Sequence, residues 1–214
     1  MSQETGLRER KKQQTRQLIS DTARRLFAER SFDEVTVAEV ARAADVSEAT
    51  VFNYFPTKED LFYGQLEAFE EALLSAIRER EPGESALSAF ARFVTTPRGL
   101  LNAKDPAAVE HLAQITRVVS ESPALLAREQ RIFAGYTDSL ARLLAEETGA
   151  RHGDIQPWVA ANAMMGVHRA LVDQSRRMIM DGVRNPKLAR DVRAQGRRAL
   201  AALEHGLGDY AIRR

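Results

Sequence analysis

The sequence predicts an all-α protein, in which an N-terminal helix-turn-helix domain precedes a helical bundle, with about nine helices in total. Apolar residues recur at helical spacing along nearly all of the 214 residues. Several segments begin with Ser, Thr or Asp, which can cap the first turn of a helix. No segment of the sequence alternates apolar and polar residues as a half-buried strand does. We expect two domains, residues 1–62 and 63–214.

The first helix is expected over residues 15–29, where apolar residues recur every three or four positions. A loop over residues 31–34 follows. Thr36 and Glu39 have the spacing of a capping box, so a second helix should begin at Thr36 and end near Ala43.

The third helix is short and begins after Ser47, a good N-cap. Val51 and Phe55 share one face, which should be buried. The other face is small and polar with one aromatic ring, and consists of Glu48, Ala49, Thr50, Asn53 and Tyr54. A helix of two turns is not stable alone, so its neighbours must hold it for the surface that it presents. Two short helices with a tight turn form a helix-turn-helix, whose second helix docks in the DNA major groove.

A fourth helix is expected over residues 58–80, after a second capping box that joins Thr57 and Asp60. This long helix would connect the two domains. Helical spacing and cap or proline signals then predict five more helices. They cover residues 86–94, 106–122, 123–148, 154–181 and 186–206.

The runs Thr36–Ala41 (TVAEVA) and Val46–Leu61 (VSEATVFNYFPTKEDL) resemble the DNA-binding domain of the tetracycline-repressor (TetR) family. The resemblance covers residues 15–62 by motif, and beyond them only in length and helix layout. It implies DNA contacts, mostly to phosphates, at Thr36, Ser47, Thr50, Asn53, Tyr54 and Lys58, with Glu48 and Ala49 as their outward neighbours. The residue in the position of Phe52 is commonly a tyrosine whose hydroxyl meets a phosphate. Phe52 has no hydroxyl, so we expect it to serve in packing only.

The total charge nearly cancels, with 31 basic and 30 acidic residues, and therefore indicates no partner. Residues 7–16, however, carry a net charge of +4. This segment is either a DNA-contacting arm, since Lys and Arg gain affinity by releasing counterions from phosphates, or an ordinary solvated and frayed terminus. The basic C-terminal region, which includes Arg193 and Arg197, is expected to form a solvated face and the rim of a dimer.

Several classes of protein are excluded by what the sequence lacks. There is no cysteine, so disulfides and thiolate metal sites are absent. The four histidines have no metal-ligand spacing, and no Gly-x-Ser-x-Gly or glycine-rich nucleotide motif occurs. We therefore expect no enzyme, no metal and no cofactor. No apolar run approaches the roughly 18 residues of a membrane span and no signal-peptide core is present, so we expect a soluble, cytoplasmic protein.

Two apolar stripes run along the helix expected over residues 154–181. One consists of Trp158, Ala161, Met165, His168, Val172 and Ile179, and the other of Ala160, Met164, Val167, Leu171 and Met178. An ordinary surface helix needs one stripe, so the second faces either another subunit or more of the same core. The family resemblance implies the former, a homodimer in which the last two helices pair across a two-fold axis into a four-helix bundle. Two half-sites about 34–36 Å apart would then be read together.

The second domain is also a candidate ligand site, because apolar walls with a few polar groups fix small molecules. The candidates are Phe62, Leu66, Phe69, Phe90, Phe93, His111, Ile115, Phe133, Tyr136, Trp158, Asn162, Met165 and Arg169. His168 is a further polar candidate. The same spacing equally describes plain core. The family resemblance implies a small-molecule inducer, largely apolar.

Together these interpretations describe a ligand-responsive transcriptional regulator, a dimeric repressor that a small molecule releases from a palindromic operator. The alternative is a helical protein-binding or structural dimer without ligand control. Salt distinguishes the two, because binding through phosphates weakens steeply as salt increases.

Overall fold

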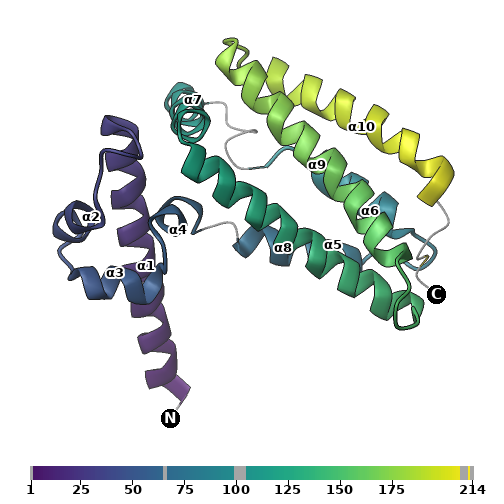
Figure 1. The fold of residues 1–214 in the computed structure, drawn as a ribbon, viewed down its shortest axis with the longest axis horizontal. Helices are drawn as coiled ribbons and strands as arrows, with labels where there is room; N and C mark the ends of the chain where they lie inside the picture. The colour runs from purple at the N-terminus through teal and green to yellow at the C-terminus, as the bar shows by residue number, and fades with distance from the viewer. Residues whose placement is uncertain (1, 65–66, 99–104, 208–211, 213–214) are drawn as a thin grey trace. The chain divides into compact units, whose positions relative to one another are not determined.

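The computed structural model describes residues 2–64, 67–98, 105–207 and 212. These residues form ten α-helices and no strand, apart from one isolated antiparallel bridge between Ser85 and Ile212 (Figure 1). The predicted all-α class is confirmed. Within the same residues, no helix is both long and apolar enough to cross a bilayer.

The chain forms two compact units. Unit 1 comprises Met1–Leu66 and Val118–Leu126, and unit 2 comprises Glu67–Arg117 and Ala127–Arg214. Unit 1 therefore contains a segment that is distant in sequence from the rest of it, and that segment interrupts unit 2.

Unit 1 begins with α1 (Ser2–Arg30), which starts well before the expected residue 15. Residues 8–17 are almost all Arg, Lys, Gln or Glu, which favour a helix but show no apolar face, so the apolar pattern begins too late to mark the start. Ile19 and Phe27 of the predicted stripe are fully buried.

The helix-turn-helix consists of α2 (Val37–Ala43) and α3 (Glu48–Tyr54), as predicted. Thr36 Oγ1 accepts a hydrogen bond from Glu39 N at 3.2 Å, and the Glu39 carboxylate accepts one from Thr36 N at 2.8 Å. This reciprocal pair completes the capping box of α2. Asp45, at φ 54°, lies in the turn between the two helices.

The expected fourth helix is two helices, α4 (Lys58–Tyr63) and α5 (Glu67–Arg78), and residues 65–66 lie outside the described part of the chain. The prediction of one continuous helix over residues 58–80 is therefore wrong. α4 ends at Gly64, where a Cβ atom would lie 2.5 Å from Phe55 Cε1. Only glycine fits beside this ring, and glycine is a poor residue for a helix interior.

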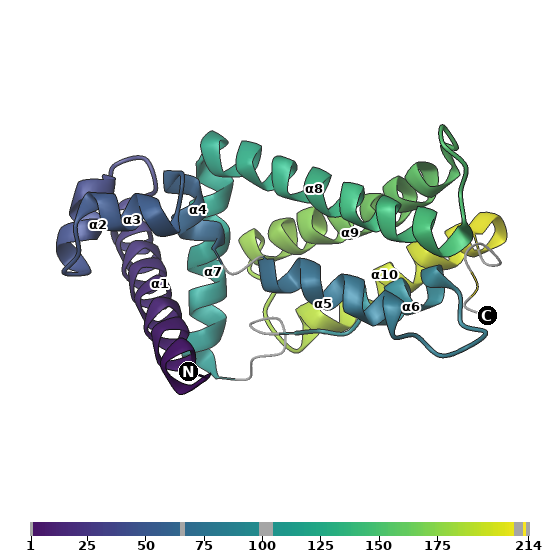
Figure 2. The same ribbon diagram turned by 90° about the horizontal axis from the view of Figure 1, so that it is seen from below.

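The later helices agree with the predicted ones to within a few residues. They are α6 (Ala86–Val94), α7 (Pro106–Glu121), α8 (Pro123–Thr148), α9 (Gln156–Met180) and α10 (Lys187–Leu207). In unit 2, α5 and α6 lie side by side (Figure 2), and α9 and α10 pair along their lengths (Figure 1). The end of α7 and the start of α8 belong to unit 1, where Tyr63 Oη donates to Leu125 O at 3.2 Å.

Unit 2 depends on close helix contacts and on buried charge pairs. A Cβ atom at Gly196 of α10 would lie 3.0 Å from Thr95 Cγ2 and 3.2 Å from Leu171 Cδ1, so the bare backbone lets α10 approach α6 and α9. The Arg80 side chain is 1% exposed and pairs with both carboxylate oxygens of Glu147, at 3.0 and 2.6 Å. Such a pair fixes geometry, because losing one partner would leave a charge buried alone.

Most residues of both apolar stripes of α9 are buried or half-buried in the chain's own core, which is the second of the two alternatives that the sequence left open. Ala161 and Met165 of one stripe, and Ala160 and Met164 of the other, are at most 1% exposed. Two stripes are needed because α9 packs against both α10 and α6. Trp158, which was expected on one of these stripes, is 45% exposed. A third face is open to solvent and carries Ile155, Trp158, Val159, Asn162, Gly166 and Ala170.

Candidate functional site

The outer face of α3 is held in place by two buried side chains. Val51 and Phe55 are each 1% exposed, which fixes the rotation of the helix about its axis. Ser47 Oγ accepts from Thr50 N at 3.1 Å and lies 2.8 Å from Thr50 Oγ1. The exposed side chains are Glu48, Ala49, Phe52 and Asn53, with Thr50 and Tyr54 half-buried beside them. All of the predicted outward residues are therefore on one surface.

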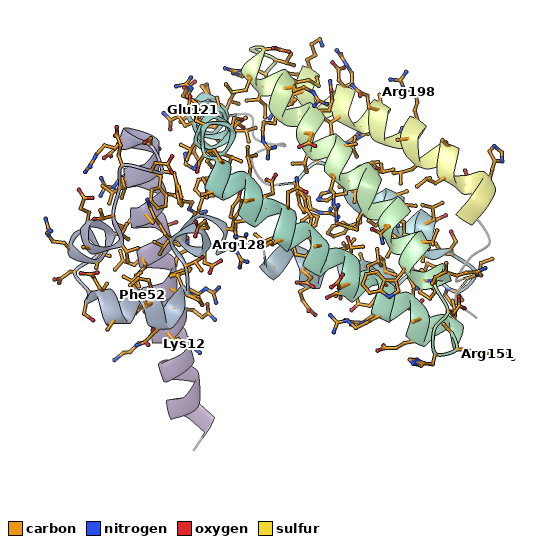
Figure 3. The ribbon with its side chains drawn as sticks, in the orientation of Figure 1. Lys12, Phe52, Glu121, Arg128, Arg151 and Arg198 are labelled. Carbon is orange, nitrogen blue, oxygen red and sulfur yellow. The ribbon has the colours of Figure 1, made fainter. Side chains whose placement is uncertain are left out.

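Phe52 does not pack in the core, contrary to expectation. It is 47% exposed and lies on α3 (Figure 3). Because successive helical residues are rotated by about 100°, the inward direction of Val51 turns Phe52 toward solvent. The exposed face of α3 thus carries an apolar ring that donates no hydrogen bond.

Thr36 is joined to an ionised carboxylate. Its hydroxyl donates to Glu39 Oε2 at 2.9 Å, and Arg30 Nη1 donates to Glu39 Oε1 at 2.7 Å. The backbone hydrogen bond from Thr36 and then that from Arg30 lower the pKa of Glu39 to about 2. The Glu39 carboxylate therefore stays ionised at neutral pH and continues to accept hydrogen bonds at the N-terminus of α2.

Lys58 is partly enclosed by aromatic rings. Its Nζ lies 4.4 Å from the Phe32 ring centroid and 6.0 Å from that of Phe27, and it donates to Asp33 O at 3.4 Å. Burial lowers the pKa of Lys58. The ammonium keeps further N–H groups for a phosphate, but its position is set by Phe32.

The basic segment near the N-terminus lies on helix α1. Arg10, Lys11 and Lys12 are exposed, while the side chain of Arg8 lies outside the described residues. Arg16 is half-buried, with its guanidinium 5.4 Å from the Phe55 ring centroid. The exposed charges therefore project from an ordered helix in the structure.

Unit 2 contains a cluster of stacked rings, which we call the aromatic cluster: Phe69, Phe93, Phe133, Tyr136 and His168. The Phe69 ring lies 5.0 Å from that of His168 and 5.6 Å from that of Tyr136, and both pairs are stacked. Phe93 meets Phe69 edge-on at 5.4 Å, and Phe133 meets His168 edge-on at 5.5 Å. Four of the predicted ligand residues are thus brought together from α5, α6 and α8.

His168 lies in the middle of this cluster and is neutral at pH 7. Burial, and then the charge of the neighbouring Arg169, lower its pKa to about 4. Arg169 Nη2 donates to Thr137 Oγ1 at 3.1 Å, which joins α9 to α8. Thr137 was not predicted, because its contact with Arg169 is between distant residues and leaves no local pattern.

The remaining candidates are dispersed. Phe90 and Met165 are fully buried in unit 2, and Ile115 is half-buried on α7. Phe62 belongs to unit 1, where it packs against Phe27 at 6.4 Å. Three residues are exposed, namely Trp158, Asn162 and His111, and Leu66 lies outside the described residues.

A groove of about 630 Å³ is lined by residues of α6 and α10 in unit 2. Leu87, Ala91 and Leu200 supply apolar surface, and Arg193 and Arg197 line it from α10. The C-terminal arginines therefore border a groove as well as solvent.

A capped helix-turn-helix followed by an all-helical second unit defines the class of helix-turn-helix DNA-binding proteins. Residues 19–63 match the family model described as bacterial regulatory proteins, tetR family, and residues 93–207 match that of the MftR C-terminal domain. The second match covers more than half of the chain, so the protein belongs to the TetR family of transcriptional regulators.

Two relatives match about two thirds or more of the chain. MftR of Mycobacterium tuberculosis, named for mycofactocin biosynthesis, is 29% identical over 165 residues, which are 74% of this chain and 78% of MftR. TcmR of Streptomyces glaucescens is 31% identical over 147 residues, which are 67% of this chain and 65% of TcmR. Both are named as transcriptional regulators.

Solved structures share the fold. NalD of Pseudomonas aeruginosa, the secondary repressor of the MexAB-OprM efflux pump, aligns with a TM-score of 0.56 and 20% identity over 91% of this chain and 98% of its own. FadR of Bacillus subtilis, solved with stearoyl-CoA, aligns with a TM-score of 0.53 and 22% identity over 87% of this chain and 96% of its own.

Proposed function

We propose that the protein is a dimeric transcriptional repressor that a small molecule releases from a palindromic operator. The observation that carries this proposal is the outer face of α3, which is exposed, rigidly oriented and lined by small polar side chains that suit a major groove. Thr50 and Asn53 contact bases, with Glu48 and Ala49 beside them. Phosphates are bound by Thr36, Ser47, Tyr54 and Lys58, which set the register on the duplex.

The exposed charges of α1 extend the DNA contact. Arg10, Lys11 and Lys12 project from one helix, and each phosphate that they neutralise releases a counterion. We therefore expect the affinity for DNA to depend steeply on salt.

The open face of α9 forms the dimer contact, together with α10. Its ends are apolar, with Ile155 70% exposed, Val159 56% exposed and Met180 50% exposed. Its centre is Gly166, where a side chain would meet nothing within 4 Å in one subunit. A glycine inside a helix costs about 1 kcal/mol relative to alanine, and a bare backbone allows two helices to pack closely. Two copies of the α9–α10 pair would make a four-helix bundle.

The aromatic cluster of unit 2 is the effector site, with Phe90, Ile115 and Met165 around it. FadR shares this fold and was solved with stearoyl-CoA, which supports the binding of a small-molecule effector. The effector needs only to bind more tightly to the form whose α3 helices are wrongly placed for DNA.

Selection from random DNA duplexes tests the proposal. The full chain should enrich a palindrome at moderate salt and lose it at high salt. Asn53→Ala should relax the choice of base at one position of each half-site, whereas Tyr54→Ala should weaken all sequences alike. Failure to enrich any sequence, with a folded protein, would contradict the proposal. Equal effects of the two variants on specificity would overturn the assigned roles.

A further inference from the structure

Arg169 is a partly buried cation with no carboxylate partner among the described residues. Within the described part of the chain, its only hydrogen bond goes to the hydroxyl of Thr137, and its Nε is buried without an acceptor. Thr137 is 2% exposed, and its own hydroxyl donates to Phe133 O at 2.8 Å. The guanidinium therefore lies against the turn of α8 that carries Phe133 and Tyr136, two members of the aromatic cluster.

A second guanidinium contacts the same cluster. The Arg98 guanidinium carbon is 3.7 Å from the Phe93 ring centroid, and Phe93 contacts Phe69. Within the described residues, neither Arg98 nor Arg169 has a carboxylate within 4.0 Å.

Other buried arginines of unit 2 show the contrast. Arg80 pairs with Glu147, and both oxygens of Glu129 accept from Arg176 Nη2 at 2.8 Å. An unpaired buried charge is costly, and an incoming anion recovers that cost through charge-assisted hydrogen bonds. Because burial keeps His168 neutral, it supplies a ring to the cluster without adding a third positive charge.

We propose that the effector is a flat, apolar molecule with one acidic group. Its ring system packs against Phe69, Phe133 and Tyr136, and its anion binds Arg169, with Arg98 as a second cation. Flat molecules suit a cluster in which Phe69 stacks on His168 and on Tyr136 at interplanar angles of 20° and 29°. This inference rests on the assignment of unit 2 as the effector domain.

Two fluorescent probes that differ in one sulfonate test the charge directly. They are 1-anilinonaphthalene-8-sulfonate, an aromatic monoanion, and its neutral counterpart N-phenyl-1-naphthylamine. Both are titrated into the full-length protein. We expect wild type to bind the sulfonate saturably, and Arg169→Gln to weaken it by about tenfold or more while changing the neutral probe by less than about twofold. Arg169→Lys keeps the charge and should retain the preference for the sulfonate.

Matched variants exclude other sites. Arg142→Gln removes an exposed charge of α8, and Arg193→Gln removes one from the groove between α6 and α10. Neither should alter binding of the sulfonate. An unchanged affinity in Arg169→Gln, an equal loss of both probes, or a loss in Arg193→Gln alone would each overturn the inference. Operator binding by the wild-type chain and by the same variants is measured in a separate experiment. If the wild-type chain selects no operator, the proposed function fails, whereas the probe titrations alone decide this inference.

Discussion

Gly64 shows how a single residue decides where a helix ends. Phe55 is 1% exposed and cannot move aside, so a methyl group at position 64 would be forced against its ring. We predict that Gly64→Ala lowers the free energy of unfolding by about 1–3 kcal/mol. Gly135, in the exposed part of α8, has nothing within 4 Å of a Cβ atom. Gly135→Ala should therefore stabilise by up to about 1 kcal/mol. Denaturant unfolding measures both, and equal signs would contradict the argument.

His168 gives a prediction of pH dependence. Its pKa is about 4 in the folded chain and 6.5 as the reference value, so the unfolded state binds the proton first as pH falls. The free energy of unfolding should decrease between about pH 6.5 and pH 4, by up to about 3 kcal/mol from this residue. His168→Phe keeps a ring and removes the titration. Unfolding at pH 7 and at pH 4.5 should show a smaller change in the variant, and identical changes would refute the assignment.

The residues that the sequence predicted best are those with local partners. Thr36, Ser47 and Thr57 are predictable as caps because the partner of a cap lies only three positions further along the sequence. The structure contains all three of these hydrogen bonds. Phe69, Phe133 and Tyr136 were identified as candidates by helical spacing alone. The lack of a carboxylate beside Arg169 in the described part of the chain was not predictable, because it depends on which distant side chains the fold brings near it.

At the scale of helices, α9 shows why a periodic pattern does not name its partner. Its two apolar stripes both face the same chain, and the face that remains open has few large apolar residues at its centre. The break between α4 and α5 was likewise hidden, since Phe62, Phe69 and Leu73 keep helical spacing across it. Burial and close contact, which only the fold provides, settle both points.

A substitution on the open face of α9 tests the proposed dimer contact. Gly166→Arg should place a charge at the centre of the dimer contact and raise the dimer dissociation constant by about tenfold or more. Gly135→Arg makes the same change on an exposed face of α8 and should leave the dimer intact. Sedimentation over a dilution series compares the two. Equal dissociation constants would show that α9 does not form the contact.

At the scale of the whole molecule, a dimer that reads a palindrome must hold its two α3 helices at a fixed spacing. DNA binding by unit 1 and ligand binding by unit 2 would not by themselves require a dimer. Only a dimer makes the affinity depend on the distance between half-sites, because helix-turn-helix dimers read half-sites that face the same side of the duplex.

The most direct test is therefore the affinity of the full chain for its selected palindrome, compared with the same palindrome lengthened by about five base pairs between its half-sites. This insertion rotates one half-site by about half a turn while leaving every base contact available. We predict a loss of about a hundredfold or more, approaching the affinity for a single half-site. Equal affinity for the two duplexes would contradict the central claim that a dimer reads both half-sites together.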